Sequence, residues 1–303
     1  MTKKFQPGSS PRINTISEYL KEEFSQKTIK LAIDGGFTCP NRDGTKGFGG
    51  CTFCSDTGSG EFSSSVDDQI RLLSKKWPDA CYLAYFQNHT NTYAPVEELR
   101  SKYYEVLQDP RIRGLVIGTR PDCLPDDVLD LLSELNESHY LWVELGLQTI
   151  HEETAQKINR CYPLEVFDDA IEKLRARGIR AVVHLILGLP GESREMMLES
   201  VKYVAGKPDL FGMKLHLFNL VKGSTMAGTD PDYVSFPNIP SYVDLVVECL
   251  EHIPYNVTIH RMTGDAPREI LISPRWSFNK RTILNGINDR MNLLDTWQGK
   301  KCE

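Results

Sequence analysis

The chain has 303 residues, of which 40% are hydrophobic and 25% are charged. This composition is that of a globular protein and argues against wholesale disorder, and the length allows one large domain or one domain with an extension. The net charge of -6 and the pI of about 5.7 argue against a surface that is basic throughout.

The two ends of the chain differ in charge from its middle. Residues 1–30 and residues 254–303 each carry a net charge of +3, so the middle is acidic. This asymmetry is compatible with an anionic partner near the termini, and equally with a chance distribution of surface charge.

No targeting or membrane-spanning segment is expected. The N-terminal segment MTKKFQPGSSPRINT lacks the apolar run of a secretory signal, and the longest apolar run, AVVHLILGL, is too short to span a bilayer. We therefore expect a cytoplasmic protein with no membrane partner. In that reducing compartment cysteines remain thiols, and clustered cysteines indicate a metal site rather than disulfides.

Apolar, β-rich runs alternate with amphipathic helical patterns after a first helical segment at 11–24. This alternation predicts a parallel sheet with crossover helices, and continuous apolar strands are typical of burial on both faces. The expected strands are 29–34, 81–86, 114–119, 140–146, 180–187 and 212–218, and the expected helices are 66–77, 96–108, 125–135, 164–178 and 193–206.

Proline and glycine interrupt the alternation after about residue 226, and a helix, a strand at 256–260 and a polar, partly aromatic tail follow. We expect an N-terminal helical extension (1–27), a core barrel (28–225) and a C-terminal α+β extension (226–303). The predicted fold class is α/β, a partial (β/α)6 TIM-like barrel, with a doubly wound open sheet as the alternative. In both, the chemistry belongs at the carboxyl ends of the strands.

The loop after the first strand, CPNRDGTKGFGGCTFC (39–54), carries three of the eight cysteines. Eleven residues separate Cys39 from Cys51, and two separate Cys51 from Cys54. Three thiolates can bind three irons of a 4Fe–4S cluster and leave the fourth iron open, whereas clusters are usually held by four cysteines. The alternatives are unrelated free thiols, or a zinc-stabilised, non-enzymatic binding module with Cys81 or His89 as the fourth ligand.

Further motifs follow at the expected strand ends, and with the cysteine loop they resemble those of radical S-adenosylmethionine (SAM) enzymes. The motifs are YFQNHTNTY (85–93), GTRPDCL (118–124), ELGLQTIHEET (144–154), LILGLPGES (185–193) and KLHLFNLVKGSTM (214–226). The common family spacing is Cys-x3-Cys-x2-Cys, and the wide first gap here resembles the subgroup of the Elongator catalytic subunit. The tail TGDAPREILISPRWSFNKRTILNGI (263–287) is similar to that of the YtqA/YhcC family, in which a glycine stands at the position of Cys161.

The resemblance implies a radical SAM enzyme with a radical SAM-type barrel, one 4Fe–4S cluster, SAM bound at the open iron, and an electron donor such as flavodoxin or ferredoxin. It implies Cys39, Cys51 and Cys54 as cluster ligands. For Glu144, a structural ion pair with Arg120 is the alternative to SAM binding. The positions implied in SAM binding are Phe53, Gln87, Asn88, Glu144, Gln148, Gly188 and Pro190.

Lys214 and His216 are the candidate catalytic residues. They alternate along the sixth strand, so both should face the same side. A satisfied polar pair in the core is the alternative.

The resemblance to Elongator-like enzymes also implies tRNA as the substrate. The implied reaction converts the 5-carboxymethylaminomethyl side chain of the wobble uridine toward 5-aminomethyl. In the tail, Arg275, Trp276, Lys280 and Arg281 combine cations for phosphates with an aromatic ring for stacking. Two alternatives remain open: a tail that only packs on the barrel, and a radical SAM enzyme acting on a small molecule or peptide.

Overall fold

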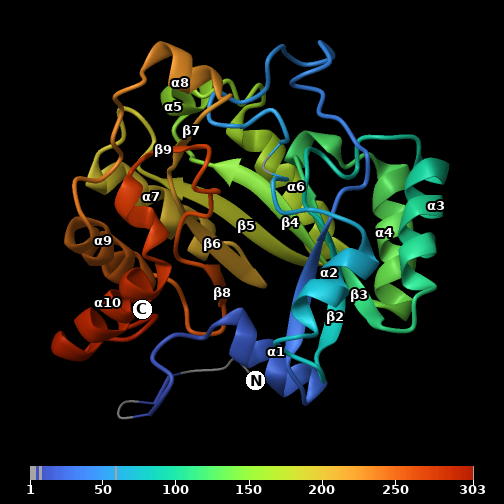
Figure 1. The fold of residues 1–303 in the computed structure, drawn as a ribbon, viewed down its shortest axis with the longest axis horizontal. Coiled ribbons are helices and arrows are strands. Elements are labelled where there is room, and N and C mark those ends of the chain that lie inside the picture. The colour runs from blue at the N-terminus through green and yellow to red at the C-terminus, as the bar shows by residue number, and fades with distance from the viewer. Residues whose placement is uncertain (1–4, 7–8, 59, 303) are drawn as a thin grey trace.

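The computed structural model describes residues 5–6, 9–58 and 60–302, which form one curled sheet of seven parallel strands with helices outside it (Figure 1). The strand order is β1-β2-β3-β4-β5-β6-β8, so β1 and β8 are the edges of an open half-barrel. The predicted fold class is confirmed. The strands are β1 (Thr28–Ile33), β2 (Cys81–Phe86), β3 (Ile112–Thr119), β4 (Tyr140–Gln148), β5 (Arg180–Leu187), β6 (Gly212–Leu217) and β8 (Thr258–Arg261).

The expected helices between the strands are present, and apolar residues at helical spacing bury one face of each against the outside of the sheet. A short two-stranded sheet, β7 (Leu220–Val221) with β9 (Leu271–Ser273), lies beyond β6. The helices are α1 (Ile16–Phe24), α2 (Val66–Leu73), α3 (Val96–Leu107), α4 (Asp126–Ser138), α5 (Glu152–Lys157), α6 (Leu164–Ala176), α7 (Arg194–Ala205), α8 (Thr225–Thr229), α9 (Ile239–Glu251) and α10 (Lys280–Leu293), with 3-10 turns η1 (Pro121–Cys123) and η2 (Arg275–Phe278).

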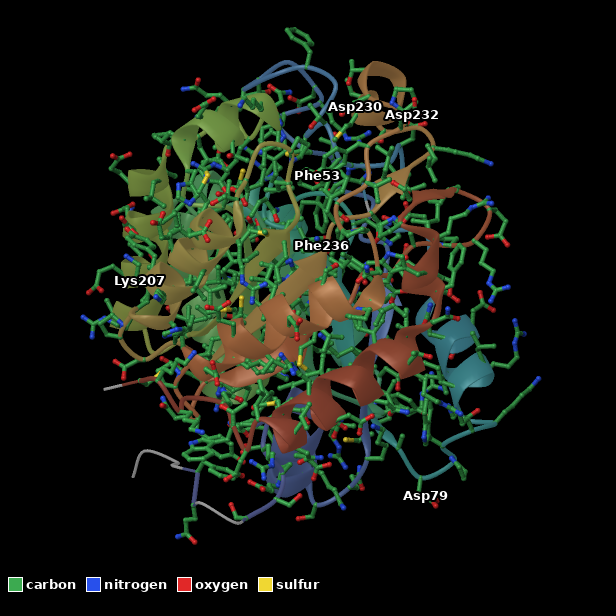
Figure 2. The ribbon with its side chains drawn as sticks, turned by 90° about the vertical axis from the view of Figure 1, so that its left-hand side faces the viewer. Phe53, Asp79, Lys207, Asp230, Asp232 and Phe236 are labelled. Atoms are coloured by element: carbon green, nitrogen blue, oxygen red, sulfur yellow. The ribbon has the colours of Figure 1, made fainter. Side chains whose placement is uncertain are left out.

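The C-terminal part completes the sheet. The strand expected at 256–260 is β8, which pairs in parallel with β6 and adds a seventh strand to the six predicted. The polar, partly aromatic tail contains a helix that was not predicted, α10, which lies beside α9 (Figure 2). Ile283, Ile287 and Met291 are fully buried at a spacing of four, a helical signal within a sequence that is otherwise polar.

The lower end of the half-barrel is closed by α1. This helix begins at Ile16 rather than near residue 11, because Thr15 caps it by accepting a hydrogen bond from the Glu18 amide. Its Leu20 packs with Trp142 and other inward-facing strand residues in a separate apolar layer. The predicted N-terminal extension also includes residues 1–4 and 7–8, which lie outside the described residues.

No helix among the described residues has the length and the hydropathy needed to cross a membrane.

Candidate active site

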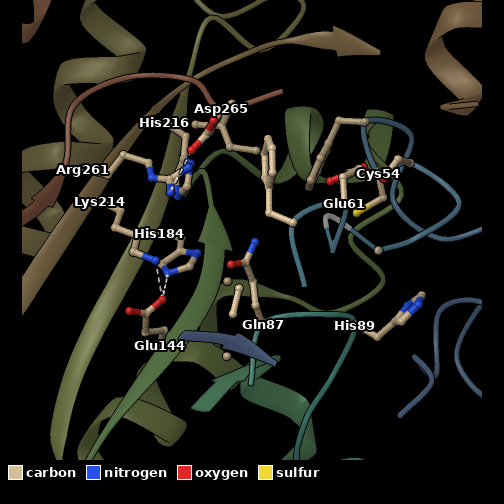
Figure 3. A pocket seen from close by; sticks show the side chains of 18 of the residues that line it. Cys54, Glu61, Gln87, His89, Glu144, His184, Lys214, His216, Arg261 and Asp265 are labelled. Atoms are coloured by element: carbon tan, nitrogen blue, oxygen red, sulfur yellow. Dashed lines mark hydrogen bonds and ion pairs between the residues drawn. The ribbon is translucent and has the colours of Figure 1, made fainter. Parts of the chain in front are cut away.

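A cavity of about 580 Å³ lies inside the half-barrel at the carboxyl ends of the strands. Its volume is within the range of small-molecule sites. Its two ends differ in chemistry and are separated by residues such as Gln87 (Figure 3). We call them the thiol end, formed by Cys39, Cys51, Phe53, Cys54 and Arg120, and the charged floor, formed by Lys30, Glu144, His184, Lys214 and Arg261.

Backbone hydrogen bonds hold the cysteine loop so that its three thiols line one end of the cavity. The carbonyl of Cys39 accepts from the Arg42 amide at 2.8 Å, and the carbonyl of Cys51 accepts from the Cys54 amide at 3.0 Å. Gly50, with φ of 78°, precedes Cys51 in the left-handed region, which few other residues adopt without strain. The loop therefore has a defined turn at the point where the second and third thiols enter the cavity.

The surroundings of the thiols fit a cluster with three cysteine ligands. The hydrogen bond from Cys54 and burial raise the pKa of Cys51 well above its ordinary value, while Arg120 and Asn41 favour the thiolate. The Asn41 side-chain amide lies 3.6 Å from the Cys51 sulfur and can donate to it. Bound iron would deprotonate such thiols outright, and the nearby cation and amide would offset the resulting negative charge.

Among the described residues, no three His, Cys, Asp or Glu side chains converge on one point as ligands of a single metal ion. A 4Fe–4S cluster does not require such convergence, because its cysteine ligands bind separate irons.

Arg120 is held in place at the thiol end. Its guanidinium donates two hydrogen bonds of 2.9 Å to Asp122 and one of 3.0 Å to the carbonyl of Arg160, and it lies over the ring of Tyr162. The alternative in which Arg120 pairs with Glu144 is therefore wrong. Strand register explains why: Arg120 follows the end of β3, whereas Glu144 pairs with Gly118, deeper in the sheet.

Glu144 is the centre of the charged floor. Its side chain has no exposed surface, and one carboxylate oxygen accepts from the indole of Trp142 at 3.0 Å and from Lys30 at 3.2 Å. The other accepts from Lys214 and from His184, the latter at 2.9 Å. A carboxylate taken out of water is costly unless it is paired and hydrogen-bonded, and here both oxygens are.

The ionisation of the floor follows from this network. Burial alone would raise the pKa of Glu144, but Lys214, Lys30 and His184 outweigh it and hold the pKa well below the ordinary value. Burial lowers the pKa of Lys214, against the attraction of Glu144. Burial, with Lys214 nearby, also lowers the pKa of His184 to about 4, so this imidazole is neutral near pH 7.

Lys214 and His216 both line the cavity, as their alternation along one strand requires. Lys214 donates to Glu144 and, at 3.2 Å, to the hydroxyl of Tyr85. The ring of His216 lies 5.1 Å from that of His184, centroid to centroid, and its Nε2 is buried without a hydrogen-bond partner among the described residues.

The predicted SAM-binding residues fall into two groups. Phe53, Gln87, Glu144 and Gln148 line the cavity, whereas Asn88, Gly188 and Pro190 are not among the lining residues. The ring of Phe53 packs against the apolar cluster that contains Ile186 and Phe218. Nearby, Asn91 donates to the carbonyls of Phe86 and Gly118 near the ends of β2 and β3, and Thr92 donates to the carbonyl of Cys123 in η1.

Several site residues were missed in the sequence, chiefly Lys30, His184, Arg261 and Arg160. Lys30 and His184 are single polar residues inside apolar runs, and that interruption was the available signal. Arg160 is fully buried and donates to the carbonyls of Leu147 and Thr149. No pattern in the sequence around Arg160 indicated that its side chain would be buried at the site.

The four tail residues predicted to contact RNA, Arg275, Trp276, Lys280 and Arg281, are not among the residues that line the cavity. Arg275 and Arg281 are exposed, and Lys280 forms an ion pair with Asp265, which does line it. The half-buried indole of Trp276 donates to the carbonyl of Phe236 at 3.2 Å and packs beside Tyr242. In this structure the ring of Trp276 thus has the packing role given by the alternative interpretation of the tail.

Comparison with known proteins gives two family matches. A model described as the radical SAM superfamily matches residues 39–204, and a model described as the radical SAM C-terminal domain matches residues 211–292. The chain is 48% identical to YtqA of Bacillus subtilis over 298 residues, which cover 95% of this chain and 92% of that protein. The similarity to YtqA expected from the tail is therefore confirmed.

A weaker similarity leads to Elongator proteins. The chain is 26% identical to Elongator complex protein 3 of Schizosaccharomyces pombe over 186 residues, 58% of this chain but only 32% of that protein. The solved structure of the archaeal Methanocaldococcus infernus Elp3 shares the fold, with a TM-score of 0.64 at 17% identity, covering 89% of this chain and 64% of that one.

Proposed function

This chain belongs to the radical SAM superfamily, and from that premise we propose that it modifies tRNA at the wobble uridine. It is a radical SAM enzyme, with a 4Fe–4S cluster and SAM as cofactors. The proposed reaction converts a 5-carboxymethylaminomethyl side chain toward 5-aminomethyl. The observation that supports the RNA substrate is the similarity to Elongator complex protein 3 over 186 residues.

Cys39, Cys51 and Cys54 would hold the cluster, and Phe53 and Gln148 would contact SAM beside it. When bound, a reduced cluster supplies one electron that cleaves a carbon–sulfur bond of SAM, and the resulting fragment abstracts hydrogen from the substrate. The residues of this chain contribute binding, orientation and exclusion of water. The buried position of the cavity inside the half-barrel suits that task, because a reactive radical must be kept from solvent.

Lys214 and His216 would act on the substrate at the floor. Burial lowers the pKa of Lys214 from its ordinary alkaline value toward neutral pH, which favours proton exchange with a bound group, and it keeps the imidazole of His216 neutral. The overall change would be an oxidation in which SAM ends as methionine and 5′-deoxyadenosine, water adds across the carbon–nitrogen bond, and the two-carbon fragment leaves as glyoxylate. Lys214 and His216 are the candidate groups for the proton transfers of that hydrolysis.

Arg275 and Arg281 would contact the RNA backbone. Both are exposed, and the pairing of β9 with β7 brings the segment before Arg275 beside the end of β6. Since the indole of Trp276 packs on Tyr242, we assign the RNA contact to the arginines rather than to a stacked tryptophan.

Nucleoside profiling of bulk tRNA from a deletion strain tests the proposed function. We expect 5-carboxymethylaminomethyl uridine to accumulate and 5-aminomethyl derivatives to disappear, with restoration by the wild-type gene but not by a Cys51→Ser variant. Unchanged wobble uridines would reject the tRNA substrate and favour a small molecule or peptide.

A further inference from the structure

The charged floor contains more positive than negative groups. Lys30 and Lys214 share the single carboxylate of Glu144. Arg261 shares Asp265 with Lys280, and its guanidinium lies 3.6 Å from that carboxylate. Four cations therefore share two carboxylates, and three of these cations line the cavity. Lys214 is buried and Lys30 and Arg261 are partly buried, so an excess of positive charge faces the cavity and suits an anion that enters with a ligand.

The strand register concentrates this charge in one row. His184, Lys214 and Arg261 are partners across three neighbouring parallel strands, so their Cα atoms lie side by side. His216 is two residues beyond Lys214 on the same face. Its Nε2, buried without a partner among the described residues, adds a polar atom that nothing in the protein satisfies.

The behaviour of Lys214 agrees with a shortage of negative charge. Burial lowers its pKa although Glu144 is in contact with it, and Lys30 and Arg261 add to the lowering. An anion placed beside Lys214 would favour its protonated form.

The carboxylate of SAM is not suited to be this anion. The resemblance to radical SAM enzymes puts SAM on the open iron, at the thiol end. The floor lies across the cavity from Cys54, beyond Gln87 (Figure 3). A second anion, belonging to the substrate, is therefore required.

We propose that the charged floor is a carboxylate-binding subsite for the substrate, in which Arg261 and Lys214 are the principal donors and His216 completes the site. The inference rests on the proposed function in one respect: a 5-carboxymethylaminomethyl side chain ends in such a carboxylate. Its structural basis is the charge and register of the floor, so it extends to any carboxylate-bearing substrate of this cavity.

The test compares two anticodon stem-loop RNAs that differ in one group. The wobble uridine carries either 5-carboxymethylaminomethyl or the corresponding neutral amide, 5-carbamoylmethylaminomethyl. Binding to the cluster-loaded enzyme with SAM and without reductant is measured by fluorescence anisotropy. We expect the carboxylate RNA to bind about tenfold more tightly than the amide, as for a charge-assisted hydrogen bond.

Variants then locate the preference. Arg261→Gln is the main variant, because its side chain is 30% exposed and its ion pair is long, so the fold should tolerate it. Lys214→Met is the second. Both should reduce the preference to about one, since the lost partner is a charge. Lys173→Met, an exposed lysine on α6, is the matched control and should retain the full preference.

A small-molecule arm separates this inference from the tRNA assignment. If neither RNA binds, calorimetry with N-acetylglycine and N-acetylglycinamide tests the floor directly. A preference for N-acetylglycine that depends on Arg261 supports the subsite and rejects tRNA. Equal binding of the charged and neutral partner in both assays overturns the subsite. The proposal is also overturned if the wild type shows no preference for the carboxylate substrate and Arg261→Gln binds SAM more weakly. That result would assign the charged floor to SAM.

Discussion

The thiol end and the charged floor line the same cavity but are built in different ways. The three thiols of the thiol end come from one loop of sixteen residues, 39–54, and are half-buried. The charged floor is formed by residues of five different strands, Lys30, Glu144, His184, Lys214 and Arg261. Glu144 at its centre is fully buried.

The difference predicts different responses to mutation. A thiol in the loop has few packing partners, so its loss should affect the cofactor rather than the fold. A charge in the floor neutralises other charges, so its loss leaves buried partners uncompensated. Mutations at the thiol end should therefore impair activity with little effect on stability. Mutations in the charged floor should impair both activity and stability.

Replacing any cluster ligand should have the largest effect. In Cys39→Ser, Cys51→Ser and Cys54→Ser, we expect iron content to fall from about four per chain toward zero and SAM cleavage to reach background, because the cluster lacks a spare ligand. Iron analysis and absorbance of the anaerobically reconstituted protein measure this. The exposed Cys302→Ser is the control. If all three variants retained full iron content, Cys39, Cys51 and Cys54 would not be the cluster ligands.

Glu144→Gln should be the most destabilising change at the floor. It leaves Lys214 and Lys30 without their shared carboxylate, and breaking a buried ion pair costs about 3–5 kcal/mol of unfolding free energy. Denaturant unfolding of the anaerobic protein measures the loss. Glu134→Gln, which breaks the exposed pair with Arg100, is the matched control and should change the free energy of unfolding far less, because solvent screens an exposed pair. A similar loss in both variants would show that burial of the floor does not matter.

Acid should weaken the floor through His184. The pKa of His184 is about 4 in the folded protein and 6.5 ordinarily. Between pH 4 and pH 6.5, His184 is therefore protonated in the unfolded chain but neutral in the folded protein. The contribution of His184 to the free energy of unfolding should therefore fall by about 3 kcal/mol as pH drops from 6.5 to 4, because a one-proton difference between the two states changes it by about 1.4 kcal/mol for each pH unit. Glu144, with its pKa held low, adds to the loss only below pH 4.5.

His184→Gln isolates this contribution, because His216 and His260, also with lowered pKa, titrate in the same direction in both proteins. The difference in unfolding free energy between wild type and variant should shrink as pH falls from 6.5 to 4. A constant difference across this range would mean that His184 is not held neutral.

The smallest effect concerns the loop beside the thiol end. Cys161 has φ of 61°, a left-handed conformation that costs a non-glycine residue about 1 kcal/mol. Cys161→Gly should therefore stabilise the protein by about 0.5–1 kcal/mol in denaturant unfolding. Asn159→Gly, at φ of 55°, is the contrasting variant, because its side chain donates to the carbonyls of Phe48 and Gly50. If both changes destabilised the protein, the claim that the backbone of Cys161 is strained would be wrong.

Local patterns were sufficient for much of the fold. The six predicted strands lie within two residues of the observed ones, because each is an apolar run bounded by turn residues. The cysteine loop was also recognisable, since its three cysteines lie within sixteen residues of the chain. The helix α10 was missed because only Ile283, Ile287 and Met291 mark its buried face.

By itself, the sequence determined the alternation of strands and helices and the three thiols that leave the first strand, because both are local properties of the chain. Only the tertiary structure decided which charges meet. Glu144 and Lys214 are 70 residues apart and Glu144 and Lys30 are 114 apart, yet parallel register brings all three together. Pairing across a sheet depends on strand order and register, which no short stretch of sequence encodes, and so the floor and its excess charge became visible only in the folded chain.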